Sequence, residues 1–411
     1  MNESRLRELL REAPLPGGAE AERRGLAVVE AAFAERERGP REGAPVRARG
    51  KRRAVSLPRL ALVLAIATLL VALLLSPAGA AVRDWVGDVF TDPPRPQPGL
   101  AETPGGGRLL VQSADGPWVV QPDGSRRLLG DFREAAWSPR GLFVATVAGR
   151  DLSALEPDGT PRWTITAPRR VFGPRWSPIR GDRIAYRSGS TLRVTAADGT
   201  EDRLLDPRVA SVSPAWSPYD PYRLAYVDAR GELWIADTES GESTGAGIAL
   251  PALAELDWAG NFILEASRTT LGLRPVKVDK LAGKTEVGTT RIGLPLPPGS
   301  EVLDAALAPN GKRVAAVVRL GEGAERTAVL LYEPRQAPPP RRLFLASGRL
   351  TELTWAPDSS RLLVAWPRFD WWLFLPVGRG SPRGVSGVAA AFTPGERGAT
   401  FPRVEGWCCA R

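Results

Sequence analysis

The chain has 411 residues, of which 43% are hydrophobic, and a formal net charge of +9. Because it contains no histidine, a Ser-His or Cys-His catalytic pair and a histidine-based zinc site are excluded. Its cations are mostly arginines scattered along the chain, with one tight cluster at residues 49–53, so the charge does not indicate a nucleic-acid-binding protein.

Residues 1–56 are polar and highly charged, and we expect a largely disordered cytosolic segment with short amphipathic helices. Leu6, Leu9 and Leu10 have helical spacing, and a second helical pattern runs from about Ala19 to Arg38. Amphipathic helices of this kind can dock on another protein. This segment is therefore a candidate binding site for a cytosolic partner.

A transmembrane helix is predicted over residues 57–82. No charged residue occurs from Leu60 to Val82, and a helix of this length reaches about 35 Å, enough to cross a hydrocarbon core of about 30 Å. The small residues Ala78-Gly79-Ala80 resemble a signal-peptide cleavage site. A signal peptide has a much shorter N-terminal region, however, so an uncleaved signal anchor is favoured over a cleaved signal.

The basic cluster lies on the N-terminal side of this apolar segment. By the positive-inside rule, the N-terminus is expected in the cytoplasm and the rest of the chain outside it. The prediction is thus a single-pass protein of the cell membrane. Residues 83–107 are rich in proline and glycine and are expected to form a stalk.

A short motif recurs through the remaining residues, 108–411. Tryptophan, serine and proline occur together at residues 137–139, 176–178 and 216–218, at intervals of 39 and 40 residues. Related triplets begin at Trp258, Leu307, Trp355 and Phe392. Between them lie short apolar runs separated by turn sequences such as Asp198-Gly199. About four strands in each 40-residue unit predict an all-β fold, a β-propeller.

The two ends of the repeat region complement each other. Residues 108–131 contain three strand patterns without the opening triplet, and residues 385–394 supply an opening triplet without a full repeat after it. The C-terminal strand is therefore expected to be the inner strand of the first blade, which closes the ring and hides its edges. Six complete repeats and this composite one predict seven blades. Six is the alternative, because residues 258–354 are irregular.

The triplet followed by a glycine turn and a strand such as Arg183-Ile184-Ala185-Tyr186 resembles the repeat of TolB-like propellers. The resemblance covers about residues 108–400 and implies a propeller fold, but the family contains binding modules as well as enzymes. The aspartate and glycine that follow the proline in that family are mostly missing here. The repeated tryptophans are expected to pack between neighbouring blades as structural residues. These tryptophans are Trp137, Trp176, Trp216, Trp258 and Trp355.

No catalytic motif, cofactor site or metal-ligand cluster is evident, and no group of carboxylates is expected around the channel of the propeller. The best candidates for exposed contacts are two predicted hairpin tips, one with Phe369 and Asp370, the other with Tyr219, Asp220 and Tyr222. The adjacent Cys408 and Cys409 are interpreted as incidental tail residues, with a vicinal disulfide or an intermolecular bridge as the alternatives.

The sequence therefore predicts a membrane-anchored propeller that binds rather than catalyses, with a protein or a cell-wall ligand on one of its faces. The alternative is a transmembrane regulator of the anti-sigma type. In that protein residues 1–56 would hold a cytosolic partner, and the propeller would sense a signal outside. A propeller hydrolase or lyase is the least supported reading, because such enzymes usually need histidine or clustered carboxylates.

Overall fold

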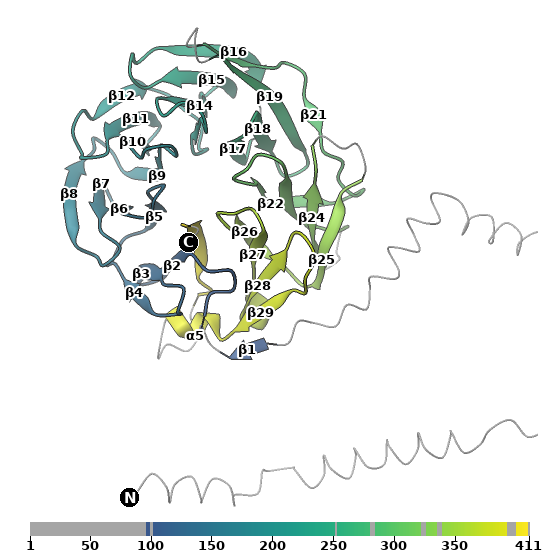
Figure 1. The fold of residues 1–411 in the computed structure, drawn as a ribbon. Helices are drawn as coiled ribbons and strands as arrows, with labels where there is room; N and C mark the ends of the chain where they lie inside the picture. Colours follow the sequence, from purple (N-terminus) through teal and green to yellow (C-terminus); the bar gives the residue numbers. More distant parts are fainter. Residues whose placement is uncertain are drawn as a thin grey trace, which may run out of the picture. The chain divides into compact units, whose positions relative to one another are not determined.

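The computed structural model describes residues 96–98, 102–250, 253–279, 284–321, 326–334, 339–392 and 400–409. In these residues the strands form seven sheets arranged as a closed ring (Figure 1). The prediction of an all-β, seven-bladed propeller is confirmed. The region from 258 to 354, which left six blades as an alternative, contains complete blades.

Each blade is an antiparallel sheet of four strands, numbered here from 1 to 7 around the ring. Blade 1 consists of β30 (Arg403–Cys408), β2 (Arg108–Ser113), β3 (Gly116–Val120) and β4 (Arg126–Leu128). Blade 2 consists of β5 (Glu134–Trp137), β6 (Val144–Ala148), β7 (Asp151–Leu155) and β8 (Pro161–Thr166). Blade 3 consists of β9 (Val171–Trp176), β10 (Arg183–Ser188), β11 (Thr191–Ala196) and β12 (Arg203–Asp206).

The next two blades continue the same order from the inner to the outer strand. Blade 4 consists of β13 (Ala215–Trp216), β14 (Arg223–Val227), β15 (Glu232–Asp237) and β16 (Ser243–Ala249). Blade 5 consists of β17 (Glu255–Ala259), β18 (Phe262–Ala266), β19 (Leu271–Asp279) and β20 (Lys284–Val287), with the short β21 (Ile292–Gly293) also paired to β19.

The last two blades complete the ring, and two short helices occur within and after blade 7. Blade 6 consists of β22 (Glu301–Leu307), β23 (Val314–Arg319), β24 (Arg326–Tyr332) and β25 (Arg341–Ser347). Blade 7 consists of β26 (Thr351–Trp355), β27 (Arg361–Trp366), β28 (Trp371–Pro376) and β29 (Arg383–Ser386), with β1 (Pro96–Pro98) added at its outer edge. The helices are η2 (Pro367–Phe369) and α5 (Val388–Phe392).

The ring closes as predicted, but with a different segment of the chain. The inner strand of blade 1 is β30, which pairs with β2 from Arg108↔Cys408 to Gln112↔Arg403. The segment expected to close the ring belongs elsewhere, because Val385 lies in β29 and Phe392 in α5. β30 accordingly lies beside β2 at the inner edge of blade 1.

The repeated tryptophans pack between blades, as predicted. Trp176, Trp216 and Trp355 are at most 6% exposed, and each indole N–H donates to a backbone carbonyl in the preceding inner strand. The acceptors are Ala136 O at 3.2 Å, Arg175 O at 2.9 Å and Ala306 O at 3.1 Å. Burial of each ring therefore seals one blade against the next, and the hydrogen bond fixes the register of the contact.

The seventh copy of the motif is Trp407-Cys408-Cys409, which the sequence did not reveal. Trp407 pairs with Leu109 as Trp176 pairs with Ile184 in blade 3. The two cysteines form a vicinal disulfide, so they are not incidental tail residues. The disulfide packs against the β5–β6 turn of blade 2, where a Cβ on Gly141 would lie 2.3 Å from the Cys409 sulfur.

The predicted stalk ends on the propeller itself. At the backbone level β1 runs parallel to β29, with Gln97 opposite Val385, and Thr103 N donates to Pro122 O at 2.9 Å. The predicted cytosolic segment 1–56, the predicted transmembrane helix 57–82 and residues 83–95 lie outside the described residues. Within the ranges that the structure describes, no helix is long and apolar enough to span a bilayer.

Blades 5 and 6 are in close backbone contact at two glycines, Gly260 and Gly311. A Cβ built on Gly311 would lie 2.5 Å from the Cα of Gly260, and φ of Gly311 is +65°. We expect Gly311→Ala to lower the free energy of unfolding by about 3 kcal/mol more than Gly149→Ala. Gly149 has a similar φ of +62° and open space around it, so this control isolates the steric clash. Urea titration measures both, and equal losses would contradict the prediction.

Candidate functional site

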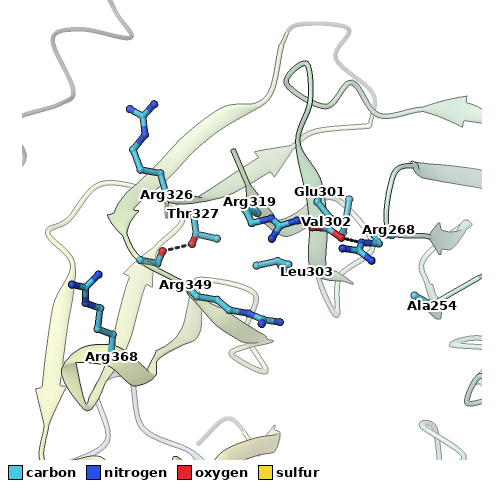
Figure 2. A pocket seen from close by; sticks show the side chains of 11 residues that line it. Ala254, Arg268, Glu301, Val302, Leu303, Arg319, Arg326, Thr327, Arg349 and Arg368 are labelled. Atoms are coloured by element: carbon cyan, nitrogen blue, oxygen red, sulfur yellow. Dashed lines mark hydrogen bonds and ion pairs between the residues drawn. The ribbon is translucent and has the colours of Figure 1, made fainter. Parts of the chain in front are cut away.

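One face of the propeller carries a cavity of about 950 Å³ beside blades 5, 6 and 7. The register of blade 6 places Glu301 opposite Arg319, and Arg319 opposite Thr327, so these residues share one end of the sheet. Figure 2 shows the arginines around this hollow. We call it the arginine pocket. It is lined by Ala254, Arg268, Glu301, Val302, Leu303, Arg319, Arg326, Thr327, Gly348, Arg349 and Arg368.

Glu301 is the only carboxylate among the lining residues. It forms ion pairs with Arg268 of the β18–β19 turn and with Arg319 at the end of β23. Its side chain is 12% exposed, whereas those of the two arginines are 75% and 50% exposed. One buried negative charge thus holds two guanidinium groups at one side of the pocket, each with donors still open to solvent.

The opposite side of the pocket is held in place by Thr327, which is 1% exposed. Its hydroxyl donates to Gly348 O and accepts a hydrogen bond from Leu350 N at 3.1 Å. Gly348 has φ of +92°, and a Cβ there would lie 3.2 Å from Cδ of Arg368. The absence of a side chain at Gly348 therefore leaves room for the Arg368 chain to run along this wall.

Besides Glu301 in β22, the inner strands carry six further carboxylates, which we call the inner-strand carboxylates. Four of them accept a backbone N–H from the next inner strand. Glu134 accepts from Gly173 at 2.5 Å, Asp257 from Leu307 at 3.1 Å, Asp304 from Leu353 at 2.7 Å and Glu352 from Val404 at 3.3 Å. The full set is Glu134, Glu255, Asp257, Asp304, Glu352 and Glu405.

Burial raises the pKa of several of these groups. The pKa of Glu255 rises to about 8, mainly through desolvation and further through the negative charge of Asp304. The pKa of Glu352 rises to about 7, again mainly through desolvation. Burial also raises the pKa of Asp257, Asp304 and Glu405. Arg175 opposes the shift at Glu255 because its positive charge favours the ionised carboxylate.

The sequence did not reveal these carboxylates as a group. Apart from Glu255 and Asp257, which lie two residues apart, they are separated by 47 residues or more in sequence, and only the superposition of the repeats brings them together. Their hydrogen bonds join consecutive blades, which is a structural task. In the described part of the chain, no three acidic or cysteine side chains converge closely enough to hold a metal ion.

The predicted contact residues lie on two different faces. Phe369 ends η2 in the turn between β27 and β28, next to Arg368 of the arginine pocket. Its ring is 45% exposed and packs edge-on against Trp366 at 4.5 Å. Asp370 caps η2 with φ of +57°, and its carboxylate accepts the N–H of Ala389 in α5 at 2.6 Å. Asp370 thus fixes α5 to the turn.

The other predicted tip lies in the β13–β14 turn, at the opposite end of its sheet. Tyr219 is 39% exposed. Asp220 forms an ion pair with Arg223 at 3.1 Å and accepts the N–H of Tyr222 at 3.0 Å. The guanidinium of Arg183 lies 5.4 Å from the Tyr222 ring centre. This tip is built by local contacts, and the structure does not bring it together with Phe369 and Asp370.

Sequence reasoning missed the five arginines of the pocket. Each lies at a strand end or in a turn, and they span a hundred residues from Arg268 to Arg368. The only signal in the sequence was the position of the arginines within the repeat. An arginine recurs near the turn between the second and third strands of three consecutive blades, 5, 6 and 7. No single stretch of the chain is rich enough in arginine to reveal the group.

No family model matches the chain, and no curated protein matches it. Among solved structures, it is similar to Kluyveromyces lactis Hsv2, with TM-score 0.50 and 11% identity over 67% of this chain and 91% of that one. It is also similar to an oligogalacturonate lyase in complex with manganese, with TM-score 0.50 and 13% identity over 67% of this chain and 83% of that one. At such identities the likeness shows the fold alone.

Proposed function

We propose that the chain is a single-pass membrane protein that presents its propeller outside the cytoplasm as a non-catalytic binding module. On this proposal it is a membrane-anchored relative of TolB-like propellers. The observation that carries the binding role is the arginine pocket, a cavity of about 950 Å³ built by three blades of a rigid ring. A site of this size suits a small ligand or a protruding group of a larger one.

Two features support binding over catalysis. Four of the six inner-strand carboxylates accept a backbone N–H of the neighbouring blade, so each of these four takes part in joining two blades. The arginine pocket holds one carboxylate, which is shared by two arginines. A guanidinium group is always protonated near neutral pH and binds anions well, but it does not serve as a general base.

The alternative function is a transmembrane regulator of the anti-sigma type, with the propeller as its outer sensor. The amphipathic patterns in residues 1–56 favour it. The two functions share one topology and differ in which end holds the essential partner. One experiment distinguishes the two functions, which is to test whether removal of residues 1–56 abolishes capture of the partner.

The test labels intact cells that express the full-length chain with an amine-reactive reagent that cannot cross membranes. Lys284 and Lys312 are exposed on the propeller, so we expect both to be labelled. Labelling only after cell lysis would contradict the proposed topology. Crosslinking in the same cells then compares the full chain with the variant lacking residues 1–56. Partners that still crosslink to the shortened variant support the function as a binding module. Loss of all crosslinked partners supports the function as a regulator.

A further inference from the structure

We propose that the arginine pocket binds a small anionic ligand carrying two or more phosphate or carboxylate groups. This inference rests on the proposed function as a binding module and names the ligand class of its site. Five guanidinium groups line the pocket against one carboxylate. A solvated protein surface usually mixes both signs of charge, so a cavity with this imbalance is stabilised when an anion enters it.

Two of the five arginines are held by Glu301, and two others have no carboxylate partner among the described residues. Arg268 and Arg319 share Glu301, and this pairing orients both toward the hollow. In the described part of the chain, Arg326 and Arg349 have no carboxylate partner, and both side chains are exposed. Figure 2 shows the guanidinium groups of Arg326 and Arg368 on one side of the pocket and those of Arg268 and Arg319 on the other. A ligand with separate anionic groups can therefore be bound from two sides.

The backbone around the pocket is held in place, because the arginines come from turns and strand ends of three blades that pack against one another. Thr327 and Gly348 fix the turn that carries Arg349. Glu301 also orients the side chains of Arg268 and Arg319, and donors that are already oriented lose less entropy when a ligand binds. Guanidinium groups also bind phosphate and carboxylate groups in a bidentate geometry, which a lysine cannot reproduce.

The size and floor of the pocket indicate a ligand larger than a single inorganic ion. The cavity of about 950 Å³ includes the apolar residues Ala254, Val302 and Leu303. A sugar ring or a short carbon chain would cover these residues while its charged groups meet the arginines.

The experiment is isothermal titration of the full-length, detergent-solubilised protein with pyrophosphate and with citrate, two probes of similar charge. Saturable binding of either probe is expected. Preference for pyrophosphate assigns a phosphorylated ligand, and preference for citrate assigns a polycarboxylate. The double variant Arg326→Ser/Arg349→Ser is expected to weaken binding at least tenfold, since it removes two charge-assisted contacts.

The matched control is Arg180→Ser, which removes an exposed arginine from the β9–β10 turn on the other face and should leave affinity unchanged. Because both altered residues of the double variant are exposed, folding is expected to persist. A second variant, Arg326→Lys/Arg349→Lys, keeps the charge and should weaken binding less. Absence of saturable binding to both probes would overturn this inference, as would equal binding by the double variant. Neither result affects the labelling of Lys284 and Lys312, so the proposed function is tested separately.

Discussion

A chain that ends at residue 402 is expected to lose its cooperative unfolding transition. The deletion removes β30, the inner strand of blade 1, together with the buried side chains of Val404 and Trp407. Trp407 also donates its indole N–H to Gly106 O at 2.9 Å. Losing a buried tryptophan alone costs about 3–5 kcal/mol, and the whole strand approaches the total stability of a domain, about 5–15 kcal/mol.

Thermal melts followed by near-ultraviolet circular dichroism measure this effect. The control ends at residue 409 and should melt like the full chain. A synthetic peptide of residues 400–411 is expected to restore the transition when added to the truncated protein, because it can pair with β2 in trans. A peptide with Val404→Ser and Trp407→Ser should fail. If the truncated chain melted as sharply as the control, the closure would not be required for the fold.

The second prediction concerns pH, where the free energy of unfolding is expected to fall by about 2–4 kcal/mol between pH 5 and pH 8.5. Folding raises the pKa of Glu255 from its ordinary value of 4.5 to about 8. Between these two values the folded state holds a proton that the unfolded state has released. A rise in pH therefore favours unfolding, and the loss is complete above about pH 8. Glu352, with a pKa near 7, changes stability in the same direction.

Guanidinium titrations at a series of pH values measure the slope. Glu255→Gln cannot ionise, so this variant should be more stable than the parent protein at pH 8.5 and should show a flatter profile. Glu239→Gln, at an exposed turn position, is the matched control and should follow the parent. An unchanged slope in Glu255→Gln would show that another group accounts for the pH dependence.

The repeat predicted most of the fold because its physical basis is local. A tryptophan that packs between blades recurs in six of the seven inner strands, and Leu307 takes its place in blade 6, so intervals of 37 to 49 residues gave the right number of blades. The last copy escaped because Trp407 follows Trp355 by 52 residues, with α5 inserted between blade 7 and the closing strand. Phe392 has the right spacing and the right apolar character, but it lies in α5, where it packs against Trp118 and Trp372.

The site was far less predictable, since charge clusters in a propeller form across blades. Arg268, Arg326 and Arg349 are each an ordinary turn or strand-end arginine in the sequence. The inner-strand carboxylates are similarly separated until the ring is closed. The hairpin tips could be located from turn chemistry, as Phe369 and Asp370 show, but which face each tip occupies depends on strand direction. Groups of side chains that lie within one repeat could be predicted from the sequence. Groups that form from several blades when the ring closes could not.

The closure also determines when the protein can finish folding during its synthesis. Trp407 and its hydrogen-bond partner Gly106 are 301 residues apart. At about 5–20 residues per second, a ribosome needs about 15–60 s to make the chain between them. Throughout that interval β2 presents an unpaired edge. The closing strand of a second nascent chain could occupy this edge and give an intertwined dimer. A low local concentration of nascent chains, and chaperones that shield strand edges, should therefore raise the yield of monomer.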